Sequence, residues 1–266
     1  MDKNYYYDCV KSGKSLKDVF IVDSHMHLGC DRNFPIQDTN NAKMLVSKMN
    51  RCGIDFGGIS SLLALGGNFE KGNDEIIALV RDYPGRFYGQ IVINPNYPEM
   101  ASRELERCWS TGCFKEIKIH PVYHKCPANG DVYRKVYHFA SGKNCPVLIH
   151  VWGVEQVSVF FELAKQYPDV TFILGHAGGE IPAQKLAVSL AKKYDNIILD
   201  ITGSWHYEGM LEFMVKEAGE DKVVFGTDAV FHEIYPVIGR IAMADMSDTS
   251  KRKVFGLNMK RILKLA

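Results

Sequence analysis

The stretch IVDSHMHLG, residues 21–29, joins an apolar, β-branched run to two histidines one residue apart. The apolar part predicts a β-strand, and side chains at positions i and i+2 of a strand point to the same side of the sheet. His25 and His27 are therefore expected to converge on one small volume. Histidine is the commonest metal ligand, so this convergence indicates a metal site.

Short apolar segments recur along the whole chain, and between them lie segments whose apolar residues have helical spacing, one of them over residues 153–169. This alternation is typical of βαβ units. The strands are apolar almost throughout, which indicates a parallel sheet that is buried on both faces. The eight predicted strands are VFIVDSH, FGGISSLL, RFYGQIVINP, KEIKIHP, PVLIHVW, VTFILGHAG, NIILDITG and KVVFGTDA.

Eight evenly spaced strands favour a closed α/β architecture, the (β/α)8 or TIM barrel, which typically takes about 250 residues. Residues 1–266 contain no linker-like stretch, so a single barrel domain is expected. Residues 247–266 predict a C-terminal extension of one or two helices on the outside. An open doubly wound sheet is the main alternative, but the glycine-rich pieces ALGGN and GHAGG match neither dinucleotide-binding nor P-loop patterns.

Composition argues against several classes of partner. The chain has 32 basic and 31 acidic residues without a dense basic run, so a nucleic-acid surface is not expected. No apolar stretch of about 18 residues predicts a membrane span, and the first 20 residues lack the apolar core of an export signal. The seven cysteines form no CxxC pair, which is typical of reduced thiols. A cytoplasmic protein is expected.

Polar residues gather where the predicted strands end. Five of the nine histidines occupy the C-terminal ends of strands one, four, five and six, and an aspartate occupies the same place in strand eight. In a parallel barrel those ends form one rim, where catalytic residues collect. The residues are His25, His27, His120, His150, His176 and Asp228.

Strand four adds a lysine to this rim. In EIKIHP, Ile117 and Ile119 point one way, so Lys118 and His120 point the other, into the barrel. A buried lysine is costly unless it is paired, modified or partly hydrated. Lys118 could bind a substrate carboxylate, carry a carboxyl group that bridges two metals, or pair with a neighbouring acid.

With these motifs in order, the chain resembles the amidohydrolase superfamily and, within it, the amidohydrolase 2 family of metal-dependent TIM-barrel hydrolases and decarboxylases. The resemblance spans nearly the whole chain, and the ordered set of rim motifs makes it specific. It is carried by DSHMH, YPGRFYGQIVINP, IKIHP, PVLIH, ILGHAGG, VVFGTDA and GLNMKRIL.

The resemblance implies a metal centre on four strands. His25 and His27 would bind the metal from strand one, His150 from strand five and Asp228 from strand eight. His176 would hydrogen-bond the metal-bound water or the substrate, or join a second metal.

The number of metals stays open, because binuclear relatives carry a carboxylated lysine at the position of Lys118. Imidazoles and a carboxylate suit Zn²⁺ and, less selectively, Mn²⁺, Fe²⁺ or Co²⁺. Zinc is the first expectation, with one or two ions per chain.

Such a metal lowers the pKa of bound water from about 15.7 to about 7 and so supplies hydroxide at neutral pH. Asp228 would take a proton from that water and pass it to the leaving group, while His176 would orient the nucleophile or stabilise an oxyanion. The first functional hypothesis is therefore a hydrolase of a small amide, lactone or ester. A decarboxylase of a small carboxylic acid is the alternative enzyme, and a non-catalytic binding barrel is the alternative from another class.

The substrate pocket is less clearly marked by the sequence. Arg32 and Lys118 could supply positive charge for an acidic substrate, with His120 beside them, and Trp152 and Trp205 follow strands five and seven as candidate walls. Tyr123, His124, His206 and His232 are further candidates on the same loops. Barrels of this kind commonly form dimers, so a homodimer is one expectation, although no interface motif is present.

Overall fold

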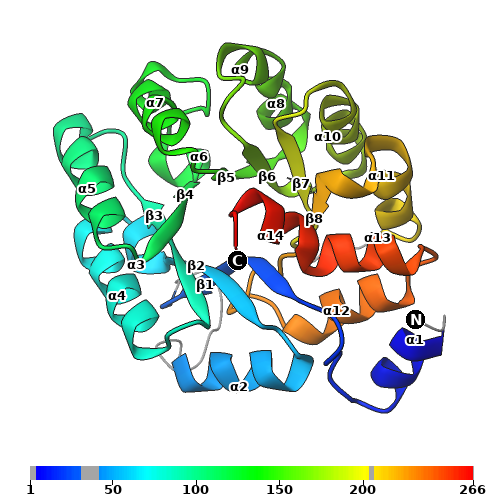
Figure 1. Cartoon of the computed structure of the whole chain (residues 1–266). Helices are drawn as coiled ribbons and strands as arrows, with labels where there is room; N and C mark the ends of the chain where they lie inside the picture. Colours follow the sequence, from blue (N-terminus) through cyan, green and yellow to red (C-terminus); the bar gives the residue numbers. More distant parts are fainter. Residues whose placement is uncertain (1–3, 31–41, 204–206, 266) are drawn as a thin grey trace.

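The computed structural model describes residues 4–30, 42–203 and 207–265, and it contains all eight predicted strands (Figure 1). The strand ranges are β1 (Val22–Leu28), β2 (Phe56–Ser61), β3 (Phe87–Val92), β4 (Phe114–Ile119), β5 (Val147–Trp152), β6 (Phe172–Gly178), β7 (Ile197–Asp200) and β8 (Val223–Val224).

The strands form one parallel sheet in sequence order, each pairing with the next from β1 to β8. Helices alternate with the strands and surround the sheet, as Figure 1 shows. The predicted (β/α)8 barrel is therefore confirmed, and the open doubly wound sheet is wrong.

Helices occupy every segment for which the sequence predicted one. The predicted helix over 153–169 is divided in two at Val159, between α8 and α9. None of the helices in the described ranges is long and apolar enough to cross a bilayer. The helices are α1 (Asn4–Lys11), α2 (Ala42–Cys52), α3 (Leu62–Leu65), α4 (Phe69–Asp82), α5 (Pro98–Ser110), α6 (Pro121–His124), η1 (Asp131–Tyr133), α7 (Arg134–Lys143), α8 (Gly153–Ser158), α9 (Phe160–Gln166), α10 (Ile181–Lys193), α11 (Met210–Ala218), η2 (Glu220–Lys222), α12 (Ile234–Met243), α13 (Asp248–Arg252), η3 (Lys253–Leu257) and α14 (Asn258–Ile262).

The sequence pattern missed α12, the helix that follows β8. Its apolar residues Ile234, Ile238 and Ile241 are buried at helical spacing. Pro236 makes the segment look like a loop, yet a proline in the first turn of a helix breaks no intrahelical hydrogen bond. The helix forms in spite of the proline because Pro236 lies in its first turn.

The amino end of the barrel is closed by the end of the chain. Met259 and Leu263 pack against Val22, Leu148 and Val224, at or near the first residues of their strands. In Figure 1, α14 accordingly lies over the centre of the ring of strands. The expectation that the C-terminal helices pack only on the outside is wrong for α14, because the open barrel end is itself an apolar surface that needs a cover.

This floor should contribute strongly to stability. Met259 is fully buried, and truncating a buried methionine typically costs about 2–5 kcal/mol. We expect Met259→Ala to lower the free energy of unfolding by that amount in urea titrations. Met243→Ala, at a methionine that is 52% exposed, is the matched control and should change it by less than about 0.5 kcal/mol. Equal effects of the two substitutions would contradict a packed floor.

Candidate metal centre

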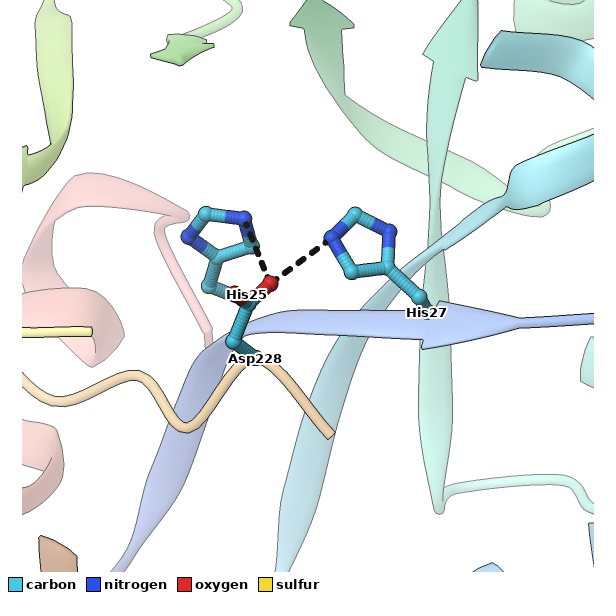
Figure 2. A group of neighbouring side chains, drawn as sticks. All are labelled: His25, His27 and Asp228. Carbon is cyan, nitrogen blue, oxygen red and sulfur yellow. Dashed lines mark ion pairs between the residues drawn. The ribbon is translucent and has the colours of Figure 1, made fainter. Parts of the chain in front are cut away.

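Three side chains from opposite ends of the sequence converge at the carboxyl end of the barrel (Figure 2). One ligand atom from each of His25, His27 and Asp228 lies within 4.8 Å of the other two, and all three residues are buried. Asp228 Oδ1 is 3.0 Å from His27 Nε2 and 3.6 Å from His25 Nε2. The predicted convergence of the two histidines is also seen in their rings, whose centroids are 5.2 Å apart.

A second carboxylate orients His25. His25 Nδ1 donates to Asp200 Oδ2 at 2.7 Å, and Asp200 Oδ1 accepts from the backbone N–H and the hydroxyl of Thr202. Because Nδ1 carries the proton, Nε2 of the neutral ring presents a lone pair to the space beside Asp228. Burial holds the pKa of His25 well below its ordinary value, and the nearby Lys118 charge lowers it further.

His27 has a more adaptable partner. Its Nδ1 lies 3.0 Å from the hydroxyl of Ser60, which can either donate or accept a hydrogen bond. Nε2 of His27 can therefore present a proton to Asp228 or a lone pair to a cation. Burial lowers the pKa of His27, against the opposing effect of its bond to Asp228, so the ring is neutral at neutral pH.

Asp228 is held in an unusual backbone conformation. Its φ is 61°, in the left-handed region that costs an L-residue about 1 kcal/mol or more. Burial raises the pKa of its carboxyl group, but the hydrogen bond to His27 and the electrostatic interaction with His25 outweigh this and hold the pKa well below its ordinary value. Asp228 is thus an ionised ligand candidate.

Lys118 lies inside the barrel, as the alternation in strand four predicted, while Ile117 and Ile119 face the helices. Its Nζ donates to His25 Nε2 at 2.5 Å. Burial lowers the pKa of Lys118 to about 8, although the charges of Asp228 and Asp200 oppose the shift. The amine lies at the edge of the group of donor atoms, and burial makes it easier to deprotonate than an exposed lysine.

Below Lys118, the same face of β4 presents a buried acid. Glu116 is fully buried and accepts a hydrogen bond from Gln90 Nε2 at 2.8 Å. Burial raises the pKa of Glu116 to about 8, and the hydrogen bonds to it only partly oppose this. A protonated acid thus separates the apolar floor from the charged rim.

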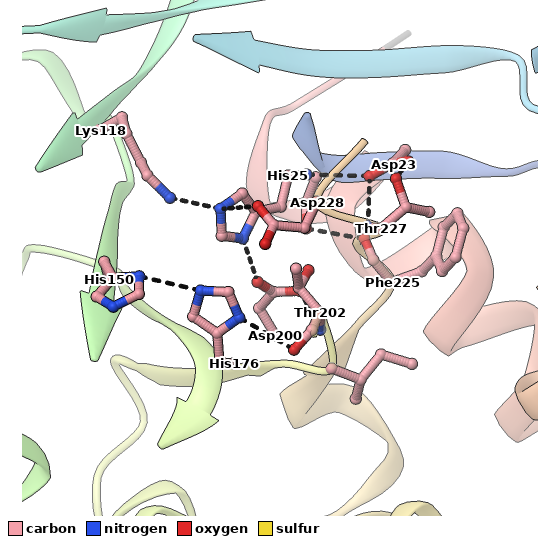
Figure 3. A network of polar contacts seen from close by, with 12 residues as sticks. Asp23, His25, Lys118, His150, His176, Asp200, Thr202, Phe225, Thr227 and Asp228 are labelled. Atoms are coloured by element: carbon pink, nitrogen blue, oxygen red, sulfur yellow. Dashed lines mark hydrogen bonds and ion pairs between the residues drawn. The ribbon is translucent and has the colours of Figure 1, made fainter. Parts of the chain in front are cut away.

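His150 and His176 form a chain of hydrogen bonds beside the three convergent residues (Figure 3). His176 Nδ1 donates to the carbonyl of Thr202 at 3.2 Å, so its Nε2 accepts from His150 Nδ1 at 3.0 Å. Burial lowers the pKa of both rings. His150 Nε2 is therefore left with a lone pair, but His150 lies outside the group of mutually close donor atoms, and its role as a ligand stays a prediction.

His120 is enclosed between two other rings. It stacks on Tyr123 and on His150, with centroids 4.1 Å and 4.0 Å away and nearly parallel planes. Its Nδ1 accepts the N–H of Tyr123 at the start of α6. Only an edge of His120 is available to a ligand.

These side chains line a cavity of about 350 Å³. Trp152 lies in its wall, as predicted, and packs edge-on to His176 at 5.7 Å. The predicted residues Arg32 and Trp205 lie outside the described residues, as does His206. The described lining is His25, His27, Leu62, Leu65, Lys118, His120, Val122, Tyr123, His150, Trp152, His176, Gly203, Asp228, Phe231 and His232.

Sequence reasoning missed the residues that hold the ligands from behind. For Asp200 the sequence did contain a usable signal, because an acid ends strand seven there, just as Asp228 follows strand eight. Ser60 lies one residue before the end of its strand, but it belongs to a residue type that is common in turns. Gly226 is a further case, because a Cβ there would meet Asp200 and Thr202.

The donor set fits a divalent cation. Two imidazoles and one carboxylate, with no cysteine among them, are ligands that Zn²⁺ and Mn²⁺ both accept. Asp200 stands behind His25 as such second carboxylates stand behind metal-binding histidines in general.

Comparison with known proteins relates the chain to a family. The sequence profile of the amidohydrolase family matches residues 22–265. A gamma-resorcylate decarboxylase from Polaromonas sp. is 19% identical, over 88% of this chain and 87% of that protein.

Solved structures share the fold. A 5-carboxyvanillate decarboxylase from Novosphingobium aromaticivorans, in complex with manganese and 4-hydroxy-3-methoxy-5-nitrobenzoic acid, has a TM-score of 0.78 at 16% identity, over 95% of this chain and 98% of that one. A 2,6-dihydroxybenzoate decarboxylase from Rhizobium has a TM-score of 0.72 at 17% identity, over 93% and 99% of the two chains.

The hydrogen bond between Asp200 and His25 can be tested through metal affinity. In Asp200→Asn, the amide must direct an N–H at either His25 Nδ1–H or the Thr202 donors, so one bond becomes a clash. We expect the Kd for Mn²⁺, measured by calorimetry, to rise by roughly 10- to 100-fold. Asp169→Asn, at an exposed position, is the control. An unchanged Kd in a folded Asp200→Asn protein would show that the carboxylate does not support the metal centre.

Glu116 predicts a pH dependence of stability. Its pKa is about 8 in the folded chain against 4.5 ordinarily, so the folded state retains a proton that the unfolded state releases. Its contribution is complete below about pH 4.5 and is lost as the pH rises toward about 8. Wild type should therefore lose stability from this group between about pH 5 and pH 7, whereas Glu116→Gln should not, because glutamine does not titrate. The free energy of unfolding of Glu116→Gln minus that of wild type should rise by at least about 1 kcal/mol over this pH range.

Urea titrations of the metal-free protein at both pH values measure this gain. Glu99→Gln, whose side chain is 80% exposed, is the matched control and should show no such gain. A parallel pH dependence in Glu116→Gln and wild type would mean that Glu116 is ionised in the folded protein.

Proposed function

Since the chain belongs to the amidohydrolase family, we propose that it is a metal-dependent decarboxylase of a small aromatic carboxylic acid. The observation that carries the proposal is the convergence of His25, His27 and Asp228 at the base of a cavity with apolar and aromatic walls. The relatives favour the decarboxylase alternative over the hydrolase hypothesis, because those compared act on substituted benzoates.

The cavity suits a flat, ionised substrate. Leu62, Leu65 and Phe231 supply apolar surface, and Tyr123 and Trp152 supply aromatic surface. A cavity of about 350 Å³ lies at the lower end of the range for small-molecule sites and accommodates a substituted single ring. The walls would exclude water from the ring while its polar edge faces the rim histidines.

His25, His27 and Asp228 would hold the metal, with His150 as a further ligand through Nε2. A bound divalent cation would supply Lewis acidity and hold anionic oxygens of the substrate. Manganese is the proposed ion in preference to zinc, because a relative with this fold contains manganese. Lys118 Nζ, at the edge of the same group, would pair with the carboxylate of the substrate.

Asp228 is the residue that we propose for proton transfer. Its Oδ1 faces His27, whereas Oδ2 lies on the side of His232, 3.8 Å away in the cavity lining. Loss of CO₂ leaves the electron pair of the broken C–C bond on the ring carbon, which must then gain a proton. Asp228 Oδ2 would take up a proton from the cavity and deliver it to that carbon.

The proposal is tested with Mn²⁺-loaded protein and a panel of 2,6-dihydroxybenzoate, 5-carboxyvanillate, and simple amides, lactones and esters. We expect CO₂ release from an aromatic acid, measured by chromatography of the product and by trapping of CO₂. Asp228→Asn should lower kcat by roughly 10²- to 10⁴-fold with the fold retained by circular dichroism. Asp169→Asn should not change kcat.

Hydrolysis without release of CO₂ would overturn the decarboxylase assignment in favour of the hydrolase. A metal-loaded protein that is inactive on the whole panel would favour the non-catalytic barrel. Near-normal turnover by Asp228→Asn would remove Asp228 from the reaction.

A further inference from the structure

The barrel is closed between its first and last strands by an irregular seam. β8 has only two residues, Val223 and Val224, and both lie opposite residues of β7. Beyond it, residues 225–229 meet β1 through three backbone bonds, from Ser24 N to Phe225 O, from Asp228 N to His25 O and from His27 N to Ala229 O, and through the isolated bridge pair of Met26 and Ala229. Such bonds fix a strand less firmly than a continuous ladder does.

A buried side-chain bridge crosses this seam. Asp23 Oδ1 accepts the backbone N–H of His25 and that of Thr227, each at 3.1 Å. Asp23 Oδ2 accepts a hydrogen bond from the Thr227 hydroxyl at 2.6 Å. The Thr227 hydroxyl oxygen in turn accepts the N–H of Ala229 at 3.2 Å. Figure 3 shows the bridge beside His25 and Asp228.

The bridge reaches the backbone of both metal-ligand segments. On β1, the bridge accepts the N–H of His25. In the segment after β8, it accepts the N–H groups of Thr227 and Ala229, the residues on either side of Asp228. Asp228 itself has a left-handed backbone, which persists only where the surroundings impose it. The three bonds to Thr227 and Ala229 supply that restraint.

Burying Asp23 has a cost that the fold must offset. The residue is fully buried, and a carboxyl group without partners in such a place is strongly destabilising. A simple apolar pair across the seam would close the barrel without that cost. The bridge differs from an apolar pair in fixing direction and distance, which is what metal ligands require.

We propose that Asp23 and Thr227 are positioning residues that set the separation of His25 and Asp228 and thereby the affinity of the metal centre. This inference rests on the metal centre in the proposed function, and it concerns metal binding rather than the reaction. Neither residue belongs to the group of three mutually close donor residues.

The test compares three variants by Mn²⁺ titration, followed by calorimetry and by the electron paramagnetic resonance signal of free Mn²⁺. Thr227→Val keeps the shape but removes the hydroxyl, and it should raise the Kd by at least roughly tenfold. Thr227→Ser restores the hydroxyl and should lie within about threefold of wild type. Thr111→Val is the matched control, because the Thr111 hydroxyl likewise donates one hydrogen bond, to the Cys108 carbonyl, and accepts one N–H, from Cys113, but at the C-terminal end of α5.

The outcomes separate the possible failures. If wild type binds Mn²⁺ and Thr227→Val binds it equally well at a temperature where both are folded, the bridge is only structural and the inference is overturned. If wild type binds no Mn²⁺, the metal centre itself fails, and the inference fails with it. Should Thr227→Val not fold, Thr227→Cys takes its place, because a thiol is a weak donor, and its Kd should also rise.

Discussion

Two electron-rich groups buried side by side impose the main constraint on this molecule. Asp228 is ionised, and His25 Nε2, 3.6 Å from its Oδ1, carries a lone pair because Asp200 holds the proton on the other nitrogen. With little water available, such groups are stable only next to positive charge. Lys118 supplies it in this structure by donating to His25 Nε2, and a divalent cation would supply it when bound.

The environment that creates this constraint begins at the other end of the barrel. Met259 and Leu263 close the amino end with apolar contacts, so the interior is shielded from solvent on that side. In the same low-dielectric interior, burial raises the pKa of Glu116 and lowers that of Lys118 and the rim histidines. Neutral imidazoles at neutral pH are the form that binds metal, so the floor and the metal centre are physically connected.

A metal centre at His25, His27 and Asp228 would be compatible with more than one reaction, because a fold and a metal site do not by themselves select a substrate. What differs between hydrolysis and decarboxylation is the ligand that the cavity accepts and the atom that receives a proton. Here the walls around Tyr123 and Trp152 favour a flat ring, and the enclosed His120 offers only an edge. In the proposed function, the loops after the strands would set selectivity, whereas the strand ends would bind the cation.

The sequence by itself determined the eight strands, the carboxyl-end rim and the convergence of His25, His27 and Asp228, because apolar runs and the two-residue period of strands are local properties. Only the tertiary structure decided which residues hold those ligands. Asp200 meets His25 across 175 positions of chain and Thr227 meets Asp23 across 204. These pairings, like the use of α14 as a floor, depend on how the strands tilt and stagger when the barrel closes, which no local pattern encodes.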